Sequence, residues 1–121
     1  MVNRLIEIRI LDSADRPIAG ANITVTINGR PGGKMRTGSN SQSPATLELD
    51  DAEASVELLA EFRGQTRSAE VAPEQNAVLF KFEAALHFPL LLPAIAECPD
   101  GTTGSPCVIC RDGPDVWKMC S

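Results

Sequence analysis

All four cysteines of this chain lie within residues 98–121, and none occurs before them. A segment this short, with few bulky apolar side chains, cannot build much of a core, so it needs a cross-link of some kind. The uneven distribution predicts an apolar-cored body and a small tail stapled through sulfur. We therefore expect three segments: a body over 1–83, an apolar proline-containing linker over 84–97 and a cysteine-rich tail over 98–121.

The body alternates apolar and polar residues in short runs that are separated by turn residues. Ile6, Ile8 and Ile10 fall on one face of the first run, because successive side chains of a strand point to opposite faces. The expected strands cover residues 5–11, 21–27, 34–37, 45–49, 55–62, 65–71 and 77–83. This pattern predicts an all-β fold, a seven-stranded Greek-key-type β-sandwich with a small cysteine-stapled C-terminal tail.

Turn signals follow the first two runs. Asp12 can accept hydrogen bonds from nearby amides and end its strand, and Pro17 restricts the backbone before the second run. The glycines and the proline between residues 28 and 33 predict a second turn or loop.

Residues 4–83 resemble the carboxypeptidase regulatory-like domain, a small β-sandwich related in fold to prealbumin. The resemblance rests on the phrase from Ile10 to Val25, with Asp12, Pro17 and a Gly-Ala pair in family positions. Asp15 stands where the family often has Gly or Asn. The resemblance implies a sandwich fold and a bacterial origin, and it says almost nothing about function because the phrase forms a structural turn.

The tail leaves three chemistries open: zinc, disulfides and a redox dithiol at Cys107 and Cys110. Cys107 and Cys110 form a C-x-x-C pair that loosely resembles a zinc knuckle, in which two thiolates hold one side of a tetrahedral ion, and Cys98 and Cys120 would complete a structural zinc site. Zinc ribbons usually have two such pairs, whereas this tail has one. Disulfides are the alternative, and four cysteines allow three pairings, of which Cys98–Cys107 with Cys110–Cys120 is one.

The linker is apolar from Ala84 to Ala96 and is interrupted by prolines, so we expect no bilayer-spanning segment here. Such a run needs cover, either from its own chain or from a partner. The expected interface residues are Leu86, Phe88, Leu90, Leu91, Leu92 and Ile95.

Composition narrows the function. The net charge is −5 without a basic patch, which argues against nucleic acid as a partner. The single histidine, His87, lies in the apolar run without a nucleophile motif, so we expect no enzyme.

We expect a non-enzymatic protein-binding or assembly module that associates with another protein or with itself as an oligomer. The alternatives are a secreted or surface filament or adhesion subunit with two disulfides, and a small redox protein that uses Cys107 and Cys110. The first residues show no basic start followed by an apolar run, so the chain as written is expected to be cytoplasmic, or extracellular if its cysteines form disulfides.

Overall fold

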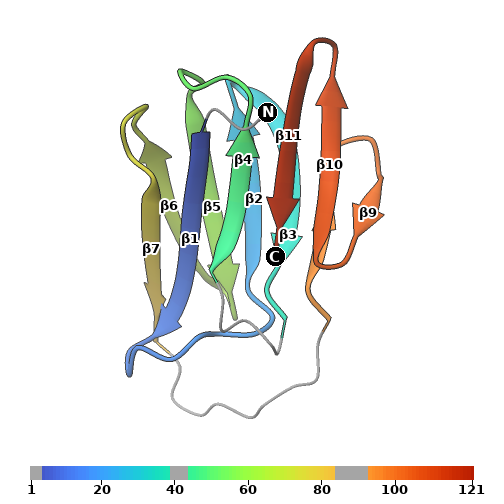
Figure 1. The fold of residues 1–121 in the computed structure, drawn as a ribbon. Helices are drawn as coiled ribbons and strands as arrows, with labels where there is room; N and C mark the ends of the chain where they lie inside the picture. The colour runs from blue at the N-terminus through green and yellow to red at the C-terminus, as the bar shows by residue number, and fades with distance from the viewer. Residues whose placement is uncertain (1–3, 39–43, 84–92) are drawn as a thin grey trace.

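The structure is a computed structural model that describes residues 4–38, 44–83 and 93–121. Two β-sheets face each other across one core (Figure 1). The strands are β1 (Arg4–Asp12), β2 (Asn22–Ile27), β3 (Arg30–Arg36), β4 (Ala45–Leu49), β5 (Val56–Phe62), β6 (Gln65–Val71), β7 (Ala77–Phe82), β8 (Ile95–Glu97), β9 (Thr103–Gly104), β10 (Cys107–Asp112) and β11 (Asp115–Cys120).

The first sheet has five strands in the order β10-β11-β4-β1-β7, and the second has six in the order β6-β5-β2-β3-β8-β9. Neighbouring strands are antiparallel except for β1 and β7, which are parallel. The prediction of an all-β sandwich is confirmed.

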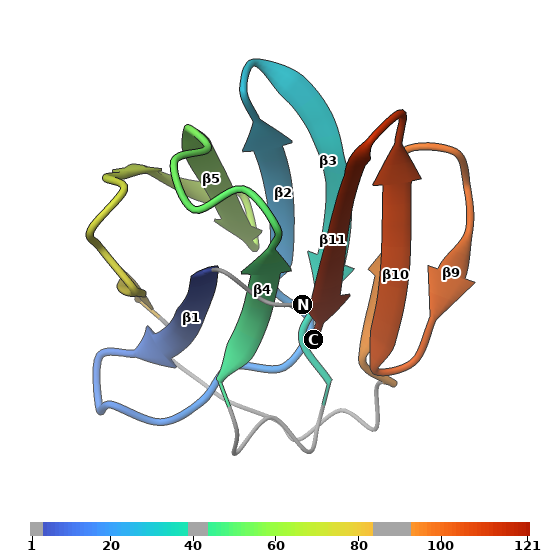
Figure 2. The same cartoon turned by 45° about the horizontal axis from the view of Figure 1, so that its top comes forward.

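The predicted number of strands is wrong for the chain as a whole, because its described residues form eleven strands and not seven. The seven expected strands correspond to β1–β7, and four more follow in sequence. Two of these four, β8 and β9, have only three and two residues, which is too short to show an alternating pattern. In Figure 2 the β10–β11 hairpin lies beside β4 and continues the first sheet.

The third strand begins earlier than predicted, at Arg30 and not at Lys34, and it lies between β2 and β8. Its turn is shorter than expected, because Asn28 and Gly29 both have positive φ and close a two-residue hairpin. Gly33 lies within the strand with φ +111, and an added Cβ would lie 2.3 Å from the Glu97 carbonyl oxygen. Glycine at this position therefore lets β8 approach β3.

The core confirms the alternation predicted for β1, since Ile6, Ile8 and Ile10 are all buried. A single cluster of buried side chains extends from these residues to Trp117 and Met119 near the end of the chain. The segment boundaries 1–83, 84–97 and 98–121 stay a prediction, but the strands of the last segment share the core of the first.

Asp12 ends β1 as predicted. Its carboxylate accepts hydrogen bonds from the backbone N–H groups of Ala14, at 2.9 Å, and Arg16, at 3.0 Å. Asp15, at the position where the resembled family often has Gly or Asn, has φ 61. Aspartate tolerates this left-handed conformation better than most residues.

Candidate functional site: the cross-linked side and the open side of the sandwich

The four cysteines form two disulfides, Cys98–Cys110 and Cys107–Cys120, with no free cysteine. This pairing differs from the one that the sequence analysis named as an example, Cys98–Cys107 with Cys110–Cys120. The reason is the β10–β11 register, which places Cys120 directly opposite Cys107, whereas Cys110 points to the other face of β10, into the core that also holds Cys98. Each therefore meets a different partner.

Cys98–Cys110 connects the two sheets. Cys98 directly follows β8 in the six-stranded sheet, and Cys110 points inward from β10 in the five-stranded sheet. Both side chains belong to the core, with 3% and 2% of their surface exposed. This bond ties the two sheets together at one lateral side of the sandwich.

Cys107–Cys120 connects two adjacent strands of one sheet. The two residues lie directly opposite each other in the β10–β11 ladder, with their Cα atoms 4.1 Å apart. Val108 and Met119 beside them are buried, so the two cysteines point to the outer face of the sheet, where both are half-buried. This bond therefore lies at the surface.

The predicted zinc site requires cysteine thiolates as ligands, and cysteines that are joined in disulfides provide no thiolate. The two cysteine pairs lie on opposite faces of the five-stranded sheet, so zinc binding by all four stays a prediction for the reduced chain only. Among the described residues, no group of three or more His, Cys, Asp or Glu side chains is arranged to hold a metal ion.

Two disulfides point to an oxidising, extracellular-type environment, which fits the alternative localisation. The expectation of a cytoplasmic protein has no support. No helix in the described segments is long and apolar enough to cross a membrane.

Most of the predicted interface lies outside the described residues: Leu86, Phe88, Leu90, Leu91 and Leu92, together with His87. Ile95 is described. It lies half-buried in β8, opposite Arg36 of β3.

The lateral side that carries Cys98–Cys110 is closed. Cys98 Sγ lies 3.6 Å from the Ile109 carbonyl oxygen. An added Cβ at Gly104 would lie 1.9 Å from the Cys107 carbonyl oxygen, so β9 packs directly against the start of β10. Figure 1 shows β9 and β10 side by side at this end of the two sheets.

The opposite lateral side is formed by β6 and β7, the last strands of their sheets. They do not pair with each other. The guanidinium carbon of Arg67 in β6 lies 5.3 Å from the ring centre of Phe82 in β7, which in turn packs edge-on against Phe62. This aromatic cluster fills the space between the sheets, while both strand edges remain at the surface.

Glutamine side chains protect the edge of β7. The Glu7 N–H donates to the Asn76 carbonyl, which fixes the hydrogen-bonding pattern of this parallel ladder. The backbone N–H and C=O groups of the even-numbered residues of β7 therefore point toward β1, and those of the odd-numbered residues point outward. The Gln75 side-chain amide donates to the Ala77 carbonyl. The Gln65 side-chain amide donates to the Glu83 carbonyl and accepts from the Glu83 N–H. Within the described residues, Leu79 and Lys81 are the only outward-pointing residues of β7 whose backbone N–H and C=O both lack a hydrogen-bond partner.

The edge of β6 is more open. Phe62 and Gln65 flank the two-residue Arg63-Gly64 turn, so the odd-numbered residues of β6 bond β5. The backbone groups of Thr66, Ser68 and Glu70 therefore point outward. The Thr66 carbonyl accepts a bond from Arg67, whereas no hydrogen bond from other described residues reaches the backbone of Ser68 or Glu70.

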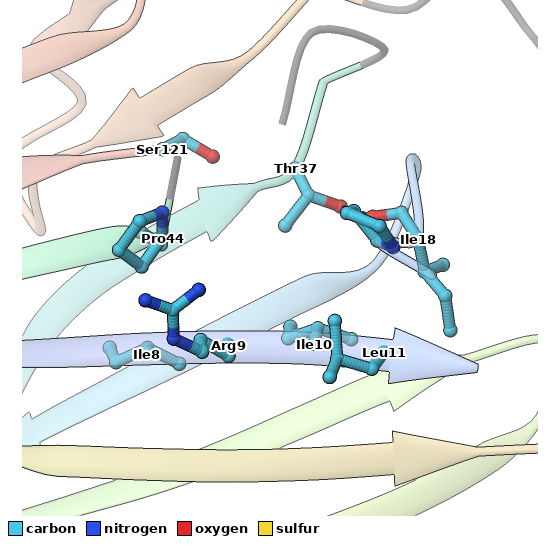
Figure 3. Close-up of a pocket in the computed structure, with 10 residues that line it drawn as sticks. Ile8, Arg9, Ile10, Leu11, Ile18, Thr37, Pro44 and Ser121 are labelled. Atoms are coloured by element: carbon cyan, nitrogen blue, oxygen red, sulfur yellow. Dashed lines mark hydrogen bonds between the residues drawn. The ribbon is translucent and has the colours of Figure 1, made fainter. Parts of the chain in front are cut away.

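The surface hollows of the described residues differ widely in size. One of about 570 Å³ spreads over the outer face of β2, β5 and β6, and includes Thr24, Leu59 and Ser68. Another, of about 30 Å³, lies beside Arg9, Thr37 and Pro44 (Figure 3). The second has room for about one water molecule, so it is too small for a larger ligand.

Sequence reasoning missed the β6 edge. Its signal was available in the Arg63-Gly64 turn, because the turn decides which residues of the following strand face outward. What the sequence could not supply was the position of β6 at the end of a sheet.

No known protein family, curated protein or solved structure matches this chain. The resemblance to the carboxypeptidase regulatory-like domain therefore stays a prediction.

Proposed function

We propose that this protein is a non-enzymatic assembly module of an oxidising compartment, and that it associates by pairing the open edge of β6 with the same strand of a second copy. The observation that supports the proposal is the contrast between the two lateral sides. One side is closed by a disulfide and by β9, whereas the other ends in a seven-residue strand with outward-pointing backbone groups. Exposed edge strands are natural sites of strand addition.

The sequence of β6 suits pairing with itself. An antiparallel pair centred on Ser68 places Thr66 opposite Glu70 and Arg67 opposite Ala69 of the second copy. No like charges lie directly opposite each other in this arrangement, and such pairs would be unfavourable. Arg67 must release the Thr66 carbonyl when the pair forms.

The test uses three single variants in sedimentation equilibrium over a dilution series. Ser68→Pro removes an N–H that points away from β5, so it weakens the edge and leaves the ladder of the sheet intact. Two bonds are lost per dimer at about 1 kcal/mol each, which predicts a roughly thirtyfold weaker dimer. Ser68→Lys places two ammonium groups opposite each other and also weakens it.

Thr24→Lys is the matched control, because it adds the same charge to the same face on an interior strand. The control should associate like the wild type. A wild-type chain that is monomeric at every concentration, or a control that weakens association as much as Ser68→Lys, contradicts the proposal.

Deletion of the cysteine tail is a poor test of association. Such a deletion removes β11, which pairs with β4, and Trp117, whose indole N–H donates to the Gly32 carbonyl at 2.8 Å. The truncated chain would lose part of its core together with any interface.

A surface filament or adhesion subunit is the second candidate, and the two disulfides favour it. Pairing of β6 with itself closes at a dimer, whereas a filament needs two different contacting surfaces. The outward-pointing backbone groups of Leu79 and Lys81 in β7 would form the second surface. Sedimentation separates the two candidates, because a filament grows beyond the dimer as concentration rises.

A redox protein based on Cys107 and Cys110 is supported by no observation here. These cysteines are bonded to different partners and lie on opposite faces of β10.

A further inference from the structure

We infer that Cys107–Cys120 is a thiol–disulfide exchange site, at which the thiol of a partner protein forms a mixed disulfide, while Cys98–Cys110 is a permanent cross-link. This inference concerns the outer face of the five-stranded sheet. It does not depend on strand addition at β6.

Access separates the two bonds. An attacking thiolate must reach a sulfur atom, so exchange depends on exposure. Cys98 and Cys110 are 3% and 2% exposed and are enclosed between the sheets, whereas Cys107 and Cys120 are half-buried on an outer face. A partner can approach the second bond without entering the core.

The fold holds the β10–β11 hairpin in place without Cys107–Cys120. β11 pairs with β4 from Trp117 to Cys120, and Met119 is fully buried. The Ser121 N–H donates to the Pro106 carbonyl at 2.9 Å, and the Ser121 hydroxyl bonds the Arg36 carbonyl. Opening the surface bond therefore leaves two thiols on a folded sheet.

An apolar contact lies next to the bond. Ile109 is two residues after Cys107 on the same face of β10, and 57% of it is exposed. A partner whose reactive cysteine is flanked by apolar side chains would bury Ile109 as its thiol meets the disulfide.

The exchange is balanced without a further reagent. The partner thiolate attacks one sulfur, a new sulfur–sulfur bond forms, and the Cys107–Cys120 bond breaks. The other cysteine leaves as a thiolate and takes up a proton. If the partner has a second thiol, that thiol attacks the partner's sulfur in the mixed disulfide and displaces the bonded cysteine of this chain as a thiolate. The partner is then oxidised to a disulfide, and Cys107 and Cys120 are reduced.

The first experiment treats the native protein with increasing dithiothreitol, blocks free thiols with N-ethylmaleimide and maps them by mass spectrometry. We expect Cys107 and Cys120 to be labelled at a reductant concentration at least about tenfold below that needed for Cys98 and Cys110. Simultaneous labelling of both pairs, or earlier labelling of Cys98 and Cys110, would overturn the inference.

A second experiment forms the mixed disulfide directly, with oxidised glutathione as the probe. Cys120→Ser leaves the Cys107 thiol at the surface and should gain one glutathione under native conditions. Cys98→Ser is the matched control, because its remaining thiol, on Cys110, lies in the core and should react only after denaturation.

Absence of glutathione on native Cys120→Ser would also overturn the inference. If Cys98→Ser unfolds, Cys110 reacts as well, and the order of reduction in the wild-type protein then decides.

Discussion

The two parts of the sandwich, β1–β7 and β8–β11, share one core but are stabilised in different ways. β1–β7 are all five to nine residues long and bury an aliphatic set that includes Ile6, Ile8 and Leu47. β8 and β9 are very short, and the segment that contains them has both disulfides. The difference teaches that a sheet can be extended by strands too small to bury much surface, provided that covalent bonds replace some of the packing.

The largest expected effect belongs to β1–β7. The buried guanidinium of Arg4 donates to the carbonyls of Ala54, at 2.7 Å, and of Val71 and Ala72, and no ion pair among the described residues involves it. Arg4→Met removes these charge-assisted bonds and leaves the buried Ala54 carbonyl without a donor among the described residues, whereas the Ala72 carbonyl keeps the Gln75 N–H. We therefore expect a loss of about 4 kcal/mol in the free energy of unfolding. Urea denaturation measures it.

Arg9→Met is the control for Arg4→Met, because Arg9 is an exposed arginine of the same strand. Its loss should be within about 0.5 kcal/mol. Equal losses in the two variants would show that the carbonyl bonds of Arg4 contribute little.

The disulfides sharpen the comparison within β8–β11. They close loops of nearly equal length, with sequence separations of 12 and 13, so chain entropy alone predicts about 3 kcal/mol for each. Because Cys98–Cys110 is also packed in the core, we expect the double variant Cys98→Ala/Cys110→Ala to lose about 1 kcal/mol more than Cys107→Ala/Cys120→Ala. Urea denaturation of the two double variants measures the two losses. Equal losses would mean that each disulfide stabilises the fold through chain entropy alone.

Trp117→Phe tests the seam where the two parts meet. The indole N–H donates to the buried Gly32 carbonyl, so phenylalanine keeps most of the packing and loses this bond. We expect a loss of about 1.5 kcal/mol. A thermal melt detects it, and an unchanged melting temperature would mean that the bond is not needed to join β11 to β3.

The smallest expected effect is the change in stability at acidic pH that comes from Asp12 and Asp100. The backbone N–H of Arg16 is the main cause that lowers the pKa of Asp12 from 3.8, and the backbone N–H of Thr102 lowers the pKa of Asp100 in the same way. A lowered folded-state pKa contributes stability above the unfolded value of 3.8, and this contribution is lost as pH falls through the folded pKa.

Asp12→Asn should therefore be less stable than the wild type at neutral pH, and the difference should shrink below pH 3.8. Urea denaturation at several pH values measures it. Asp100→Asn should show the same trend more weakly, because Asp100 makes only an exposed turn bond. A difference for Asp12→Asn that does not change with pH contradicts the assignment.

Local patterns predicted β1–β7 well where each strand had its own alternation. In β2, which covers most of the expected strand 21–27, the alternate residues Ile23 and Val25 are buried. The prediction failed at the start of β3, because Pro31, Gly32 and Gly33 have turn-like chemistry but are held in the sheet by β2. A glycine that serves close approach of another strand cannot be told from a turn glycine by sequence.

For the candidate site, the sequence alone determined that the four cysteines would cross-link a segment with little core, and which faces of the long strands are apolar. These properties are local, because the alternation of a strand requires only its own residues. The tertiary structure decided the pairing of the cysteines, the joining of β10–β11 to β4 and the position of β6 at a sheet end. The reason is that cysteine pairing and edge exposure depend on which strands become neighbours, and distant parts of the chain decide this together.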